Sequence, residues 1–276
     1  MSLLSNERVI IALEPRLLAL VRVRGALAPR IVAKQTVRCD PGPGAEPWHG
    51  ALAALEAIAA SLHARESAVR VVLSNHFVRY AIVAADAAAS STEEDMGLAR
   101  FAFARIHGER AKTWDIRLSA APGGRDRLAC GIDQALIDSI KAYFPRGGKA
   151  RLVSIQPYLM SAFNRMRRMV PADGAVILVA EHDRLCIASW VDNNWLGVRN
   201  IPKAPASIAE HVILLEQERG RLGGESMPHT ALVHPPQRLR KARQSSHWSF
   251  RPVAPLRLQG FTLAADDAYA MALSAL

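Results

Sequence analysis

Two short turns carry the charged side chains best placed to do chemistry, Glu14-Pro15-Arg16 and Glu181-His182-Asp183. Glu14 and Asp183 are candidate metal ligands, because many nucleases hold two metal ions between carboxylates on neighbouring strands. A turn that binds nucleotide phosphate needs other residues: glycine, which lets backbone amides approach the phosphate, and aspartate, which organises Mg²⁺ through water. Neither turn contains a glycine or has an aspartate where that ion would need it. Both turns therefore favour a site that has lost nucleotide chemistry.

Each turn lies between the first two predicted strands of a longer pattern, found from Arg8 to Ser74 and again from Ala175 to His234. Each copy reads as three strands, an amphipathic helix and a further strand, because apolar runs give way to apolar residues at helical spacing. The predicted strands of the first copy are 8–13, 17–24, 30–37 and 69–73, and its helix carries Leu52, Leu55, Ile58, Ala59 and Leu62.

In the second copy, Pro205 is expected to open the helix and Gly220 to close it. The predicted strands of this copy are 176–180, 184–191, 194–201 and 230–233. A duplicated βββαβ unit of this size predicts an α/β protein with the actin-like, or ribonuclease-H-like, fold in two lobes.

An inserted β-α-β-β-α subdomain is expected between the copies. Ser91 to Glu94 reads as a capping box that opens a helix, with Met96, Ala99, Phe103 and Ile106 on its inner face. Pro122 to Gly124 reads as a turn between two strands, and Asp133 as the cap of a second helix. The predicted domains are residues 1–76 plus 146–170 for the first lobe, 77–145 for the insertion and 171–276 for the second lobe.

Other nucleotide motifs also fail. The chain has Val233-His234-Pro235-Pro236 where a glycine pair would hold an adenosine, and Gly148-Lys149 lacks the rest of a P-loop. We therefore expect no catalytic residue, no bound cofactor and no metal site, and we interpret the turns at Glu14 and Glu181 as degenerate phosphate turns.

The composition and the N-terminal sequence indicate the cellular compartment in which the protein is expected. The longest charge-free apolar runs are far shorter than the ~20 residues that a membrane helix needs. The N-terminus has no cleavage site typical of a secretory signal. Cys39, Cys130 and Cys186 are odd in number and widely spaced, which is typical of thiols in a reducing compartment. These features predict a cytoplasmic protein.

The net charge of +10 admits nucleic acid or an anionic membrane as a partner. Arginine carries most of this charge in an alanine-rich chain, a composition that a GC-rich genome favours without functional pressure. The basic run Arg238 to Arg243, near Trp248 and Phe250, has the mixture that suits single strands or lipid headgroups, although a solvated segment is the simpler interpretation. A second basic run, Arg165 to Arg168, fits a solvated helix face.

Several segments, in order, resemble a group of proteobacterial proteins similar to PilM and to the cytoplasmic part of GspL, over about residues 8 to 235. They are Val71-Val-Leu-Ser-Asn-His-Phe-Val-Arg-Tyr80, Ser91-Thr-Glu-Glu94, Trp114-Asp-Ile-Arg117, Ser154-Ile-Gln-Pro157, Phe163-Asn-Arg165 and Arg184-Leu-Cys-Ile187. The resemblance implies the actin-like fold with an inserted subdomain. It also implies a cytoplasmic scaffold in type IV pilus or type II secretion assembly.

The resemblance further implies a bitopic inner-membrane partner, PilN-like or equivalent, whose short cytoplasmic tail docks on the fold. PilM keeps a nucleotide site, but this chain departs from it at each matching position, so nucleotide binding is not carried over. GspL continues into a membrane helix, and this chain shows none, so membrane attachment is expected only through the partner. A homodimer remains open, and nucleic acid is not expected. The alternatives are a metal-dependent ribonuclease-H-like nuclease using Glu14 and Asp183, and a nucleic-acid-binding module using Arg238 to Arg243.

Overall fold

A computed structural model describes residues 7–40, 42–84, 92–119, 126–202, 205, 207–224, 227–235, 247–254, 258–262 and 264–276. Four features predicted from the sequence involve residues outside this set: the capping-box Ser91, the turn at Pro122–Gly124, Pro236 and the basic run Arg238–Arg243. No helix within the described part of the chain is long and apolar enough to cross a membrane.

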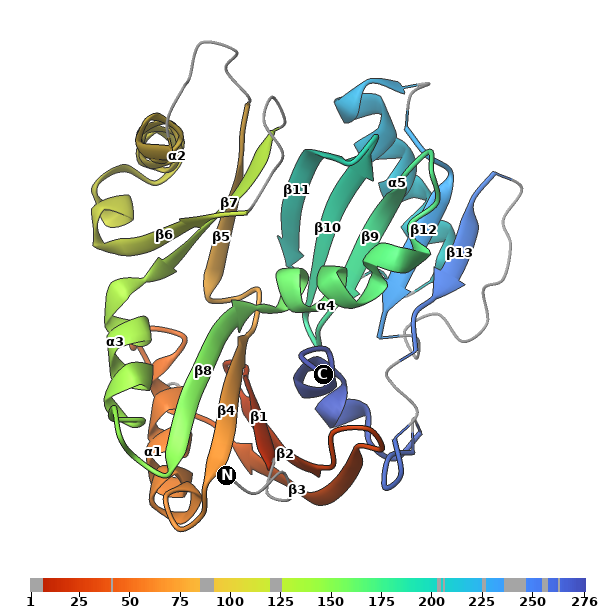
Figure 1. The fold of residues 1–276 in the computed structure, drawn as a ribbon. Helices are drawn as coiled ribbons and strands as arrows, with labels where there is room; N and C mark the ends of the chain where they lie inside the picture. The colour runs from red at the N-terminus through yellow and green to blue at the C-terminus, as the bar shows by residue number, and fades with distance from the viewer. Residues whose placement is uncertain are drawn as a thin grey trace. The chain divides into compact units, whose positions relative to one another are not determined.

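The chain forms two compact units. Unit 1 comprises residues 1–77, 133–165 and 255–276, and unit 2 comprises residues 78–132 and 166–254. The sequence analysis predicts two lobes and an inserted subdomain, whereas these two units are groups of residues in mutual contact. The predicted domain boundaries therefore stay a prediction. Each unit contains one five-stranded sheet (Figure 1).

The sheet of unit 1 has the strand order β3-β2-β1-β4-β8. Its strands are β1 (Arg8–Leu13), β2 (Leu17–Arg24), β3 (Arg30–Arg38), β4 (Ser67–Leu73) and β8 (Ala150–Pro157). The first three strands are antiparallel, whereas β4 and β8 run parallel to β1. Strand β1 is buried at five consecutive positions, which is typical of a strand covered on both faces, and α6 packs on it.

Helix α1 (His49–Leu62) packs on β2 through the apolar residues predicted for it, and α6 (Ala270–Leu273) packs on β1, β2 and β4. Arg70 on β4 donates to the carbonyl oxygen of Ala275 at 2.7 Å, so it joins the sheet to the end of α6. Helix α4 (Tyr158–Met166) follows β8 and buries Leu159, Phe163 and Met166.

Helix α3 (Gln134–Ala142) was expected to belong to the inserted subdomain, but it groups with unit 1 and packs on α1. A ring nitrogen of His63 lies 2.8 Å from the carbonyl oxygen of Tyr143, just after α3. The predicted cap is confirmed, since Asp133 Oδ1 accepts from the Ala135 amide at 3.0 Å.

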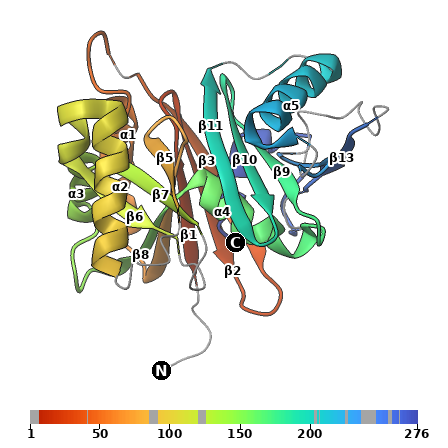
Figure 2. The ribbon, with the colours of Figure 1, turned by 90° about the horizontal axis from the view of Figure 1, so that it is seen from above.

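The main sheet of unit 2 has the strand order β11-β10-β9-β12-β13. Its strands are β9 (Ala175–Ala180), β10 (Arg184–Val191), β11 (Asn194–Pro202), β12 (Thr230–His234) and β13 (Ser249–Pro252). Helix α5 (Ile208–Leu222) covers one face and buries Leu215 in the sheet's core (Figure 2).

Three details of unit 2 correct the sequence predictions. No strand was predicted after 230–233, but Ser249–Pro252 pairs in parallel with β12. The helix does not open at Pro205: it begins at Ile208, and Ser207 Oγ accepts from the Glu210 amide at 3.2 Å. It runs past Gly220 and ends before Gly223, whose φ of 118° suits a left-handed C-cap.

The duplication extends to the register of the strands. Leu13 pairs with Leu18 in β1–β2, and Ala180 pairs with Leu185 in β9–β10, at a constant sequence offset along both hairpins. The third strand of each sheet is bulged at the equivalent place, after Arg22 in unit 1 and after Ser189 in unit 2. The predicted duplicated fold is confirmed.

A three-stranded sheet in unit 2 has the order β5-β7-β6, formed by Val78–Val83, Arg127–Asp133 and Trp114–Leu118. Helix α2 (Thr92–His107) packs on β5 and β6, and a 3-10 helix (Gly108–Thr113) that was not predicted connects it to β6 (Figure 2). Phe103 and Trp114 meet edge to face at 5.7 Å in this core. Ile106, predicted to face inward, is instead 61% exposed.

Candidate functional site

The first turn connects β1 to β2 through Glu14, Pro15 and Arg16. The Glu14 amide donates to the carbonyl oxygen of Leu17 at 2.9 Å, which closes a tight hairpin. The Cys39 amide donates to the carbonyl oxygen of Arg16 at 3.0 Å, so the end of β3 braces the turn. Glu14 and Pro15 are half-buried, and Arg16 is exposed.

The second turn, Glu181 to Asp183, has the same closure. The Glu181 amide donates to the carbonyl oxygen of Arg184 at 2.8 Å. His182 and Asp183 are exposed, but Glu181 is only 5% exposed, a difference from Glu14 that the sequence did not predict.

A thiol lies near the carboxylate of each turn. Burial raises the pKa of Cys39 to about 11, and the charge of Glu14 adds to the rise. Burial raises the pKa of Cys186 well above its usual range, with a further contribution from Glu181. Neither thiol is in a disulfide. Both are protonated near neutral pH, so neither is suited to act as a nucleophile.

The backbone of the two turns does not form a phosphate cradle. The described residues with positive φ lie outside both turns. The fold needs glycine elsewhere: Gly174 has φ of 102°, and a Cβ there would lie 2.2 Å from the carbonyl oxygen of Trp190. Backbone amides that converge on a phosphate usually require such left-handed residues, and these turns have none.

The strand that follows each helix ends beside the corresponding turn. After β4, the Ser74 amide donates to the carbonyl oxygen of Leu13 at 2.9 Å, and Asn75 Oδ1 accepts from the Leu159 amide at 3.3 Å. After β12, His234 Nδ1 lies 3.1 Å from the carbonyl oxygen of Val253. All three side chains are fully buried and bonded within the protein. At the carboxyl ends of these strands, where α/β proteins bind ligands, each of these three side chains makes contacts within the protein.

Metal binding has little support in the described residues. Glu14 belongs to unit 1 and Asp183 to unit 2. Within the described ranges, no three His, Cys, Asp or Glu side chains form a group suited to a metal ion.

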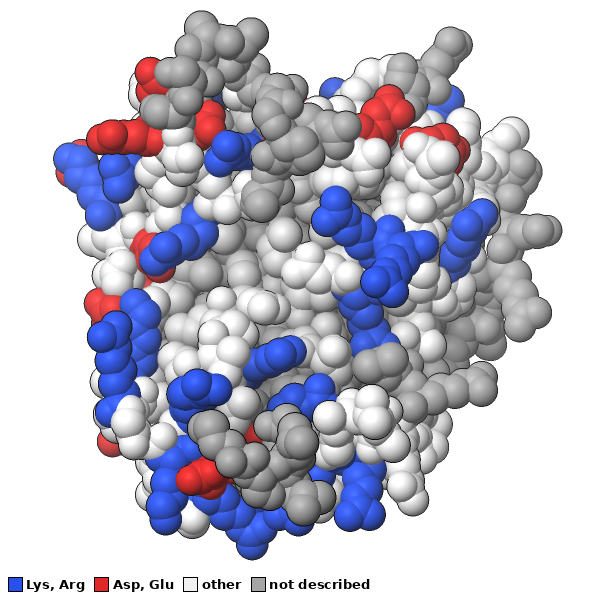
Figure 3. Space-filling model, in the orientation of Figure 1, with Lys and Arg blue, Asp and Glu red and all other residues white. Residues whose placement is uncertain are grey.

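Basic side chains occur in several separate groups on the face shown in Figure 3. In the shorter basic run, Arg165 is not simply solvated, because its Nη1 donates to the carbonyl oxygen of Leu273 at 3.4 Å and burial lowers its pKa. Arg167 and Arg168 are exposed.

An apolar groove of about 390 Å³ lies beside α2 in unit 2. Its lining consists of Arg100, Phe101, Ala104, Ala111, Lys112, Trp114 and Ile116. Phe101 is 65% exposed, and Leu98 and Ile106 on the same helix are also exposed. Large apolar side chains gathered in this way are typical of a docking surface. The helical spacing of α2 was recognised from the sequence, but its exposed face was not.

Comparisons with known proteins agree on the fold. No family model matches the sequence, and no curated protein matches it. Among solved structures, the chain is similar to the PilM–PilN type IV pilus biogenesis complex, with a TM-score of 0.64 and 16% identity over 97% of this chain and 96% of that chain. It is also similar to the cytoplasmic domain of EpsL, an inner-membrane component of the type II secretion system of Vibrio cholerae, with a TM-score of 0.57 and 13% identity over 90% of each chain.

A third similar structure is a Bacteroides thetaiotaomicron protein of unknown function with an actin-like ATPase fold, with a TM-score of 0.54 and 9% identity over 83% of this chain and 80% of that chain. The chain therefore has the actin-like fold, and its resemblance to the PilM and secretion-system group is confirmed at the level of fold.

Proposed function

We propose that this protein is a non-catalytic actin-like scaffold in a type IV pilus or type II secretion-like assembly. The observation that carries the proposal is the state of the two hairpin turns. Both keep the same closing hydrogen bond, at Glu14 and at Glu181, yet neither has the glycine or the positive φ that a phosphate cradle needs. Similarity over almost the whole length of the PilM–PilN structure supports the assembly role.

The proposed partner is a bitopic inner-membrane protein, PilN-like or equivalent, bound through its short cytoplasmic tail. On this proposal the protein is cytoplasmic and reaches the inner membrane only through that partner. The groove beside α2 is the proposed docking surface. Its walls are apolar, and its charged lining residues, Arg100 and Lys112, are cationic, which suits an apolar segment flanked by acidic residues.

Equilibrium binding of labelled ATP with Mg²⁺, followed by a turnover assay, tests the non-catalytic half. We expect neither micromolar affinity nor phosphate release above the rate without protein. Binding of ATP with a micromolar dissociation constant would contradict the proposal. If Glu14→Lys or Glu181→Lys then tightened that binding, because lysine replaces a negative charge by a positive one, the turns would still bind nucleotide.

Synthetic peptides copied from the cytoplasmic tails of single-span inner-membrane proteins encoded beside this gene test the partner half. We expect one peptide to bind, and Phe101→Ser to weaken binding by about 2 kcal/mol, since a central apolar anchor commonly contributes that much. Ile213→Ser is the matched control, because Ile213 is 59% exposed on α5, away from the groove. Equal binding by both variants would remove the groove as the docking surface.

The alternatives of a nuclease and of a nucleic-acid-binding module are not favoured. The first lacks a described group of metal ligands, and the second depended on Arg238–Arg243, which lies outside the described residues.

A further inference from the structure

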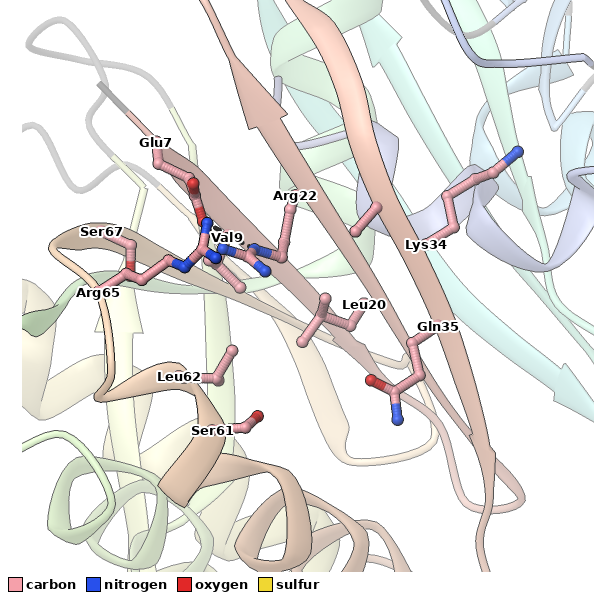
Figure 4. A pocket seen from close by; sticks show the side chains of 11 residues that line it. Glu7, Val9, Leu20, Arg22, Lys34, Gln35, Ser61, Leu62, Arg65 and Ser67 are labelled. Atoms are coloured by element: carbon pink, nitrogen blue, oxygen red, sulfur yellow. Dashed lines mark hydrogen bonds and ion pairs between the residues drawn. The ribbon is translucent and has the colours of Figure 1, made fainter. Parts of the chain in front are cut away.

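A polar cavity of about 170 Å³ lies in unit 1, at the opposite end of the sheet from the turn at Glu14. It lies between the start of β1, the end of β2 and the last turn of α1 (Figure 4). Its lining consists of Glu7, Val9, Leu20, Arg22, Ala33, Lys34, Gln35, Ser61, Leu62, Arg65 and Ser67. The cavity is large enough for several water molecules or a small polyatomic ion.

Positive charge exceeds negative charge around this cavity. Glu7 is 6% exposed and is held by two arginines: Oε1 accepts from Arg22 Nε at 2.7 Å, and Oε2 accepts from Arg24 Nε at 2.9 Å. Burial opposes ionisation of Glu7, but the hydrogen bonds from Arg22 and Arg24 outweigh it and lower the pKa of the carboxyl group. Glu7 is therefore charged at neutral pH, and one carboxylate is shared by two guanidinium groups.

Arg65 adds a further positive charge. Figure 4 shows its side chain extending from the loop after α1 toward Glu7 and Arg22. Its guanidinium group forms no hydrogen bond or ion pair with any of the residues that the structure describes. Arg22 and Arg65 line the cavity, and Arg24 binds Glu7 without lining it; together they bring three positive charges, and Glu7 offsets one of them. Two positive charges therefore remain.

Lys34 does not add to this excess. Its ammonium group lies 2.7 Å from Asp266 Oδ1 and donates to the carbonyl oxygen of Gly260 at 3.0 Å. Figure 4 shows that its side chain points away from Glu7 and Arg65.

A buried hydroxyl group on the cavity wall has no partner. Ser67 is 9% exposed, and its Oγ forms no hydrogen bond within the described part of the chain. Leaving such a group unsatisfied costs about 1–3 kcal/mol, so it normally meets a protein atom, a water or a ligand. Ser67 begins β4, and its amide is already committed to the carbonyl oxygen of Lys149 at 3.0 Å. The free hydroxyl is therefore the group available to a ligand.

We propose that this cavity binds a phosphate-sized oxyanion with up to two negative charges, such as inorganic phosphate or the phosphoryl group of a larger molecule. Arg65 and Arg22 supply charge-assisted donors, and Ser67 Oγ supplies a neutral one. A phosphate carries between one and two negative charges at neutral pH, which matches the two uncompensated positive charges. The proposal does not depend on the proposed scaffold role, because none of the residues that line the cavity belongs to either hairpin turn or to the groove beside α2.

Two sources of this phosphoryl chemistry are open, a soluble phosphate and a lipid headgroup. The hairpin tip between β2 and β3 follows Arg24, and its Leu27 is fully exposed at 102%. An exposed leucine beside arginines suits the surface of an anionic bilayer. The experiment below therefore has an arm for each source.

Calorimetric titration of the whole chain with inorganic phosphate, at constant ionic strength in a buffer without other oxyanions, measures the affinity directly. We expect saturable binding with one site, and a dissociation constant raised at least about tenfold in Arg65→Gln and in Ser67→Ala, since a hydrogen bond to a charged group contributes about 1.5–3 kcal/mol. Arg38→Gln is the control, because Arg38 is exposed and does not line the cavity. Its affinity should equal that of the wild-type protein.

The thermal unfolding midpoint separates loss of the site from loss of the fold. Without phosphate, Ser67→Ala should unfold at or above the wild-type temperature, because it removes an unsatisfied hydroxyl group. With phosphate, the wild-type midpoint should rise and the Ser67→Ala midpoint should rise less. Absence of phosphate binding to the wild-type protein, or equal binding by wild type, Arg65→Gln and Ser67→Ala, would overturn the proposal.

Sedimentation with vesicles distinguishes the two sources. Pelleting with phosphatidylglycerol vesicles, but not with phosphatidylcholine vesicles, that is lost in Arg65→Gln and in competition with phosphate would assign the site to a lipid headgroup. Phosphate binding without pelleting would assign it to a soluble anion. Pelleting that Arg65→Gln leaves unchanged would place any membrane contact outside the cavity.

Discussion

The two sheets differ where their first strands begin. Glu7 precedes β1 in unit 1, and Gly174 precedes β9 in unit 2, at equivalent positions of hairpins that share one register. On the neighbouring strand, Arg22 and Arg24 of unit 1 correspond to Ser189 and Val191 of unit 2, both of which are buried.

The difference shows two ways to end the same hairpin. In unit 1 a buried carboxylate binds two arginines and leaves a polar cavity beside it. In unit 2 a glycine with φ of 102° brings the backbone against Trp190 and leaves no room for a side chain. The stability that the ion pairs of Glu7 contribute depends on pH and salt, whereas the contribution of Gly174 depends on backbone geometry alone.

Replacement of Gly174 by alanine should have the largest effect on stability. The new Cβ would meet the carbonyl oxygen of Trp190 at 2.2 Å, so we expect a loss of at least ~3 kcal/mol at any pH. Tryptophan fluorescence during urea unfolding measures it, since four of the five tryptophans belong to unit 2. Gly108→Ala is the control: φ is 60° but no atom lies within 4 Å, so only about 1 kcal/mol should be lost. Equal losses would show that the close approach is unimportant.

Unit 2 also has a buried carboxylate that binds two arginines, on α5 rather than at the start of a strand. Glu218 is 1% exposed, and its oxygens lie 2.9 Å from Arg199 Nη1 and 2.8 Å from Arg221 Nη2. Both arginines are partly exposed, so Glu218→Gln should cost about 2 kcal/mol, between the values for surface and fully buried pairs. Thermal unfolding checks this. A loss no greater than that of Glu109→Gln, which breaks an exposed pair with Lys112, would contradict it.

Glu7→Gln should cost less, about 1–2 kcal/mol at neutral pH, and its effect should depend on pH. The folded-state pKa of Glu7 lies below its ordinary value of 4.5, so the carboxylate stabilises the fold above that value and loses its contribution as pH falls through the lower one. Unfolding midpoints of wild type and variant should therefore converge in acid. A difference that stays constant from pH 7 to pH 3 would exclude the ion pairs as its cause.

The smallest effect is expected at the two turns. Glu14→Gln should lower the pKa of Cys39, because the negative charge of Glu14 helps to raise it. Thiol labelling across a pH series, read by mass spectrometry at each cysteine, should show faster reaction of Cys39 and an unchanged rate at Cys130. Glu181→Gln should act on Cys186 in the same direction, but with little labelling, since Cys186 is fully buried. An unchanged labelling rate at Cys39 would show that the charge of Glu14 does not raise the pKa of this thiol.

Much of the fold could be predicted because its signals are local. The apolar runs of β1 and β9, the buried face of α1 and the turns at Glu14 and Glu181 each lie within a few consecutive residues. Strand β13 was not predicted because it has only four residues and ends in Pro252. Its extended conformation depends on pairing with β12, which is distant in the sequence.

The candidate sites were less predictable because their residues come from distant segments. Arg22 and Arg24 meet Glu7 only through the register of β1 and β2, and Ser67 and Arg65 join them only after α1 has packed. The exposed face of α2 was predicted incorrectly at Ile106, because periodicity shows which residues share a face but not how wide the covered stripe is.

The composition of unit 1 has a consequence for synthesis on the ribosome. Three separate segments build this unit, and the last of them is residues 255–276. Helix α6 covers β1, β2 and β4, so the face of the sheet that it buries stays open to solvent while almost the whole chain is being translated. Unit 2, which ends at residue 254, can close earlier. The first strands to leave the ribosome therefore belong to the unit that is completed last.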